Sequence, residues 1–66
     1  MKIIVNGNEM EFQENISVQG MLDVMNNQNK MIVIEKNLEI ISKENFAQTI
    51  LKDGDNIEII SFVGGG

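Results

Sequence analysis

The chain has 66 residues, the size of one small domain near the lower limit for folding without disulfides or bound metal. It contains no cysteine and no histidine, which excludes disulfides, zinc–thiolate sites and most catalytic triads, so stability must come from one apolar core. Ten acidic residues against five basic ones give a net charge of −5, which argues against nucleic acid and suits either a basic protein partner or simple solubility.

The N-terminal segment predicts a β-hairpin. Residues 2–5 form a short run rich in β-branched residues, and Asn6-Gly7-Asn8 supplies turn formers. Met10 and Phe12 then alternate with polar residues, so the second strand should have one buried face and one exposed face.

A helix should follow, with Ser17 as its N-cap. Apolar residues recur at helical spacing after it and should form one buried face: Val18, Met21, Leu22 and Met25. We interpret this stripe as core packing rather than as a soft-metal or promiscuous binding surface. Gly20 should cost this helix about 1 kcal/mol relative to alanine, and it would permit close approach to a sheet.

The middle of the chain predicts further strands. Residues 31–35 are strongly apolar and should lie well inside the sheet, and Lys36-Asn37 should turn the chain into a short return strand at residues 38–41. Residues 42–46 resemble a single capped helical turn that buries Phe46. Residues 48–51 suit either a short strand or irregular chain.

Residues 52–56 predict a turn in which Gly54 supplies a positive φ. Asp53 and Asp55 could serve as an acid–base pair or as metal ligands, but no third ligand accompanies them, and turn chemistry is the better interpretation. The final strand should run from Ile57 to Val63, directly into the glycines.

The order of these elements predicts an α+β fold of the β-grasp (ubiquitin-like) type, a mixed sheet with one helix packed across it. In this arrangement the first and last strands lie side by side and parallel at the centre. We expect a β-grasp domain over residues 1–63 and a flexible glycine tail over residues 64–66. No signal peptide or membrane span is evident, so we expect a cytoplasmic protein.

Alternation along the last strand predicts which of its side chains face a partner. If Ile57 and Ile59 pack beneath the helix, then Glu58, Ile60 and Phe62 point outward on the open face of the sheet. An apolar patch beside the tail suits partner docking, unless other side chains cover it.

The chain ends in three glycines, Gly64, Gly65 and Gly66. Glycine has no Cβ, so this run has no fixed conformation and is thin enough to enter a narrow channel. It suits a terminal carboxylate that reaches into the active site of a partner enzyme. A frayed terminus, or glycines added by cloning, would produce the same sequence. No helix follows to make the glycines a phosphate-binding loop, and the sequence shows no catalytic constellation.

Together these motifs resemble one known family. Asp53-Gly54-Asp55-x-Ile57-x-Ile59, followed by Phe62-Val63-Gly64-Gly65-Gly66, is similar to the thiamine-biosynthesis sulfur-carrier proteins of the ThiS type. The resemblance covers the whole chain, including the segments 2–7 and 33–37 and the aromatic residue at Phe46.

The resemblance implies a sulfur carrier that is not itself an enzyme and binds no cofactor. A ubiquitin-activating-type adenylyltransferase (ThiF-like) would use ATP and Mg²⁺ to adenylate the Gly66 carboxylate. A persulfide sulfur donor would then give a thiocarboxylate, which thiazole synthase (ThiG-like) would accept. Gly65 and Gly66 would occupy the narrow channel of the partner, and Gly64 would give the tail additional length and conformational freedom. A carrier that docks on one enzyme after another is expected to be a monomer.

The same sequence is also compatible with other functions. The small subunit of molybdopterin synthase has the same fold and tail, but such chains are usually longer. A sulfur carrier for tRNA thiolation and a ubiquitin-like protein modifier are further alternatives. A non-catalytic β-grasp interaction domain would belong to a different class and would not need its chain to end at the glycines.

Overall fold

A computed structural model describes residues 1–27 and 31–62. Strands, one α-helix and a short 3₁₀ turn follow one another along the chain as β1 (Lys2–Val5), β2 (Asn8–Glu11), α1 (Val18–Val24), β3 (Ile32–Lys36), β4 (Glu39–Ile41), η1 (Lys43–Asn45) and β5 (Asn56–Ser61). Within the described residues, no helix has the length and apolar character needed to cross a membrane.

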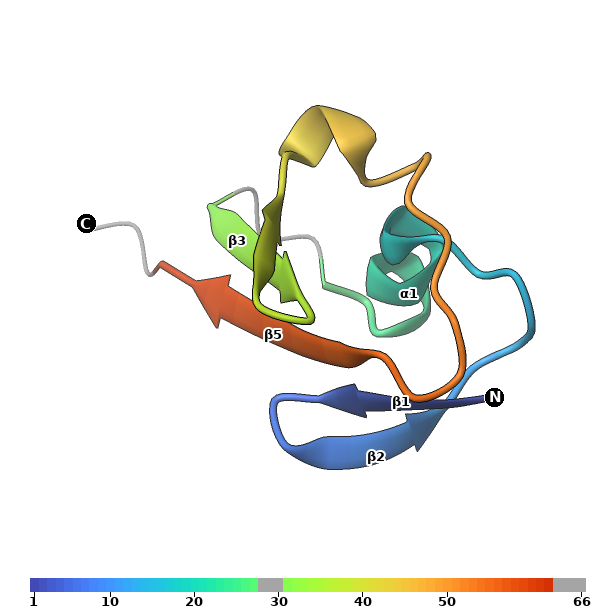
Figure 1. Cartoon of the computed structure of the whole chain (residues 1–66). Helices are drawn as coiled ribbons and strands as arrows, with labels where there is room; N and C mark the ends of the chain where they lie inside the picture. The colour runs from blue at the N-terminus through green and yellow to red at the C-terminus, as the bar shows by residue number, and fades with distance from the viewer. Residues whose placement is uncertain (28–30, 63–66) are drawn as a thin grey trace.

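The strands form one mixed sheet in the order β2-β1-β5-β3-β4 (Figure 1). The last strand, β5, lies at the centre, parallel to β1 and antiparallel to β3. This topology, with α1 against one face of the sheet, confirms the predicted β-grasp fold.

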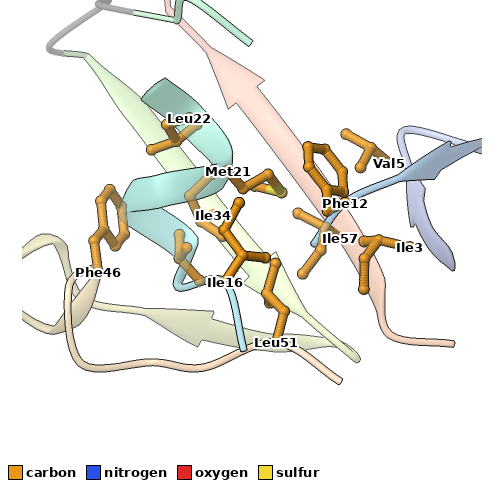
Figure 2. Close-up of a cluster of buried hydrophobic side chains, with 11 residues drawn as sticks. Ile3, Val5, Phe12, Ile16, Met21, Leu22, Ile34, Phe46, Leu51 and Ile57 are labelled. Atoms are coloured by element: carbon orange, nitrogen blue, oxygen red, sulfur yellow. The ribbon is translucent and has the colours of Figure 1, made fainter. Parts of the chain in front are cut away.

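The core lies between α1 and the sheet. Val18, Met21 and Leu22 are buried on the helix, and Ile34 and Ile57 are fully buried on the central strands. Figure 2 shows Met21 directed toward these two isoleucines. Burying each such side chain contributes about 1.5–3 kcal/mol relative to leaving it exposed, so the predicted helical stripe helps to hold the two layers together.

The start of α1 is defined by local contacts. Ser17 Oγ accepts a hydrogen bond from the backbone N–H of Gly20 at 2.9 Å, which confirms the predicted N-cap. A Cβ at Gly20 would lie 2.9 Å from Cγ1 of Ile16, a residue of the preceding loop. The close approach at Gly20 is therefore to this loop and not, as expected, to the sheet.

Two tight turns join the antiparallel pairs. Asn6 and Gly7 have φ values of 50° and 82°, which suits a two-residue hairpin with both central residues at positive φ. In the second turn, Asn37 and Leu38 take the positive φ values. The predicted turn at Lys36-Asn37 is therefore wrong by one residue, because Lys36 stays in β3 and pairs with the first residue of β4.

The segment before β5 is irregular chain rather than a full strand. Residue Ile50 forms an isolated bridge with Ser17, and Leu51 is buried. The predicted burial of Phe46 after the helical turn is confirmed. The strand β5 ends at Ser61, and Val63 and the glycine tail lie outside the described residues.

Candidate functional site

The central strand β5 carries the residues predicted to meet a partner, and its two faces differ as the alternation indicated. Ile57 is fully buried and Ile59 packs against the core. Ile60 and Phe62 keep 41% and 50% of their surface exposed, and Glu58 is exposed as well. The predicted orientation of these side chains is confirmed, whereas their role in docking stays a prediction.

Strand pairing brings further side chains to the side of the sheet that α1 leaves uncovered. Val33 lies opposite Ile60, and Glu35 lies opposite Glu58. On the neighbouring strand, Ile40 lies opposite Glu35 and is 71% exposed. We call the following set the open face: Val33, Glu35, Ile40, Glu58, Ile60 and Phe62.

The sequence pattern did not identify Ile40 as a residue of the exposed face. Strand alternation could have indicated it, because adjacent residues of a strand point to opposite faces and Ile41 packs against the core. An apolar neighbour of a core residue on a short strand is therefore a candidate for exposure.

The open face combines apolar area with negative charge. Like charges directly opposite one another in a sheet destabilise it. No salt bridge within the described residues neutralises Glu35 or Glu58. Such a surface is complementary to one that presents apolar and basic side chains.

The carboxylates of the Asp53-Gly54-Asp55 turn close the turn and tie it to the beginning of β1. Asp53 Oδ1 accepts a hydrogen bond from the backbone N–H of Lys2 at 2.7 Å. Asp55 Oδ2 accepts one from the backbone N–H of Lys52 at 2.8 Å, and Gly54 has the expected positive φ. Turn chemistry is thus the observed role of both aspartates. In the part of the chain that the structure describes, no three potential ligand side chains gather as a metal site.

Asn37 clamps the β3–β4 turn to the beginning of β5. Its Nδ2 donates to Asp55 Oδ1 at 3.0 Å, and its Oδ1 accepts from the backbone N–H of Asn56 at 2.9 Å. Because Asp55 is only 9% exposed, its part of this network is shielded from water. The clamp holds the adjacent Leu38 at a φ of 73° with 84% of its surface exposed.

Asn6 forms a second clamp on β5. The ladder between β1 and β5 stops at Val5 and Ile57, although β5 continues to Ser61. Asn6 Oδ1 accepts a hydrogen bond from the backbone N–H of Ile59 at 2.7 Å. The side chain thereby replaces the main-chain carbonyl that a longer β1 would have offered. Nothing in the sequence distinguished this role from that of an ordinary turn residue.

The N-terminal ammonium is held beside the end of β2. It donates hydrogen bonds to the carbonyl oxygen of Phe12 at 2.8 Å and to Glu11 Oε2 at 3.3 Å, and Glu14 lies 3.6 Å away. The hydrogen bond to Glu11 raises the pKa of this ammonium above its ordinary value of 8.0, although desolvation acts in the opposite direction.

Fold and site together define a ubiquitin-like β-grasp domain whose central strand precedes the glycines in the sequence and contributes to an apolar, acidic face. The chain belongs to the ThiS family, whose family model matches residues 3–66.

Similarity to named proteins supports this family assignment. The sulfur carrier protein ThiS of Bacillus subtilis is 38% identical over 63 residues, a match that covers 94% of this chain and 96% of that protein. The thiazole synthase of Paramagnetospirillum magneticum is also 38% identical, over 66 residues. That match covers all of this chain but only 20% of the thiazole synthase, so this chain spans a small part of that relative's length.

A solved structure supports the fold at full length. The crystal structure of the thiamine biosynthesis protein ThiS from Geobacter metallireducens superposes with a TM-score of 0.86 at 33% sequence identity. The superposition covers 100% of both chains.

Proposed function

We propose that this chain is a sulfur carrier protein of thiamine biosynthesis and acts as a protein co-substrate rather than as an enzyme. The observation that carries the proposal is the match of the ThiS family model through Gly66, which includes the whole glycine tail. The Bacillus subtilis relative, which is named a sulfur carrier and is matched over nearly its full length, supports it. The absence of cysteine and histidine from the sequence agrees with a carrier that leaves catalysis to its partners.

The reacting group in this proposal is the Gly66 carboxylate. A ThiF-like adenylyltransferase of the ubiquitin-activating type joins it to AMP, using ATP and Mg²⁺ and releasing pyrophosphate. AMP is a good leaving group, so the terminal sulfur of a persulfide attacks the carbonyl carbon and displaces it. Cleavage of the resulting acyl disulfide by a thiol leaves a thiocarboxylate at Gly66.

The acceptor in this proposal is a thiazole synthase (ThiG-like), which takes sulfur from the thiocarboxylate. Its support comes from two relatives: the thiazole synthases of Paramagnetospirillum magneticum and Magnetococcus marinus each contain a segment similar to this entire chain, at 38% and 27% identity. A carrier-like segment within a thiazole synthase is expected if the two act on the same sulfur.

Intact-mass spectrometry tests the carrier chemistry directly. The chain is incubated with ATP, Mg²⁺, a ThiF-like enzyme and a persulfide source. We expect a mass gain equal to one sulfur atom minus one oxygen atom, localised to the C-terminal peptide. An unchanged mass, with an enzyme shown to be competent on another carrier, would contradict the proposal.

Three variants provide matched controls for this experiment. Appending one alanine after Gly66 should abolish sulfur transfer while the unfolding curve stays the same, because the reactive carboxylate is displaced by one residue. Gly65→Ala should impair transfer more than Gly64→Ala, because a Cβ next to the terminal residue clashes with a narrow channel. Sulfur transfer to the extended chain would show that Gly66 is not the reacting residue.

A further inference from the structure

The inference concerns the edge of β5 beyond the end of β1. Figure 1 shows β5 running past the β1–β2 turn. The ladder to β1 ends at Ile57, and Asn6 Oδ1 caps the N–H of Ile59. Within residues 1–27 and 31–62, no strand pairs with β5 on this side beyond that cap.

The register of β5 against β3 fixes the direction of the remaining backbone groups. The N–H of Phe62 donates to the carbonyl oxygen of Met31 at 2.8 Å, so Phe62 belongs to the residues that bond with β3. In an antiparallel pair, alternate residues bond to the partner strand and those between point away from it. The N–H and carbonyl of Ser61, and the carbonyl of Ile59, therefore point away from β3. They lie on the edge of β5 along which β1 pairs only as far as Ile57.

An exposed strand edge of this kind is a template for pairing with another chain, and natural sheets usually cover it. This edge is short, and the side chains of Ile60 and Phe62, on either side of Ser61 in the sequence, are exposed. Extended peptides bind such edges through main-chain hydrogen bonds, while side-chain contacts give specificity.

We propose that the Ile59–Ser61 edge of β5 is completed by an extended segment of the adenylating partner, which adds to the sheet as a strand. The acidic residues of the adjoining open face, Glu35 and Glu58, favour a segment with basic side chains next to apolar ones. Strand addition at Ser61 fixes the direction in which the chain leaves the domain, and this directs the tail into the active site of the partner. The inference rests on the proposed carrier function, because it assigns the occupant to that partner.

Residue-level amide hydrogen exchange by NMR tests the pairing. The backbone amides of the ¹⁵N-labelled chain exchange with D₂O either in the free chain or in its complex with a ThiF-like enzyme without ATP. Exchange is then stopped, the complex is dissociated, and the remaining amide signals are measured by NMR. In the free chain we expect the Ser61 amide to exchange rapidly and the amides of Ile60 and Phe62 to be protected by β3. In the complex, protection of Ser61 should rise about tenfold or more, as for an amide that gains a net hydrogen bond.

A proline substitution provides the second measurement. Ser61→Pro removes the N–H that faces the edge but none that bonds to β3, and proline is tolerated at edge positions. Its matched control, Ser61→Ala, removes only the hydroxyl group. We expect Ser61→Pro to weaken binding to the enzyme about tenfold, Ser61→Ala to bind as the wild type does, and Phe62 to keep its amide protection in both.

Several outcomes would overturn the inference. One is unchanged Ser61 protection in a complex that forms. Another is Ser61 protection that rises with the concentration of the chain alone, because a second copy would then be the occupant. Equal binding of the proline and alanine variants would also overturn it. If wild-type chain accepts sulfur and any of these results is found, only strand addition fails; if it accepts no sulfur, the proposed function fails as well.

Discussion

Phe62→Ala should weaken binding to the adenylating partner strongly while leaving the domain folded. Phe62 follows the last residue of β5 and keeps 50% of its surface exposed in the free chain. A phenylalanine buries about 150–250 Å² when fully covered, so about 100 Å² is open to a partner. At about 25 cal/mol per Å², covering this area is worth about 2.5 kcal/mol.

Because 1.4 kcal/mol corresponds to a factor of ten, the dissociation constant should rise about 60-fold if the partner covers the ring completely. The half of the ring that is already covered limits the loss of unfolding free energy to about 2.5 kcal/mol. A domain of this size has an unfolding free energy of about 3–10 kcal/mol, so the variant should stay folded. Isothermal titration calorimetry measures the binding, and urea unfolding measures the stability.

Val24→Ala is the matched control for this experiment. Val24 is 64% exposed, like Phe62 an apolar residue open to solvent, but it lies on α1 and not on the open face. Its truncation should leave binding within about twofold, as expected for a residue outside an interface. Equal binding of Phe62→Ala and wild type, or equal weakening by both variants, would refute docking at Phe62.

Three further changes test other parts of the domain. Asp55→Ala removes both hydrogen bonds that its carboxylate accepts and should lower the unfolding free energy by about 2–4 kcal/mol in urea; a loss below about 0.5 kcal/mol, typical of neutral surface positions, would contradict the clamp. Gly20→Ala should destabilise by about 1 kcal/mol in the same assay, because the contact with Ile16 outweighs the gain in helix propensity; a stabilised variant would show that the loop yields. The Met1 ammonium has a raised pKa, so its contribution to stability is complete below pH 8.0 and is lost as pH rises through the higher folded-state pKa. Urea unfolding across this range should show the decline, and Glu11→Gln should reduce it.

Periodicity in the sequence was sufficient to predict the layers of the fold. The helical spacing of Val18, Met21 and Leu22 identified the face of α1 that is buried, and alternation after Ile57 identified the outward residues of β5. Both inferences depend only on which side of an element a residue lies, and that property is local. Both inferences can therefore be made without knowledge of the tertiary contacts.

What the sequence did not reveal depends on contacts between distant segments. The bond from Ile59 to Asn6 joins residues 53 positions apart, and the bond from Asn37 to Asp55 joins residues 18 positions apart. A turn-forming asparagine looks the same whether its amide faces water or another strand, so neither clamp has a local signature. The one-residue error at the second turn has a related cause, because leucine rarely takes the positive φ that Leu38 adopts.

The two clamps explain how one strand can contribute both to the core and to an exposed apolar surface. Asn6 and Asn37 have nearly equal φ values of 50° and 51°, a conformation that asparagine tolerates better than most residues. Glycine would also accept this backbone conformation, but it has no side chain that could bond to β5. Asn37 bonds to Asn56 at the beginning of the strand, and Asn6 bonds to Ile59, just before the exposed apolar residues Ile60 and Phe62. The strand is therefore held from its first residue up to Ile59. Since Ile57 is fully buried in the core between the two clamps, the position of Ile60 and Phe62 is set by contacts within the domain before any partner is bound.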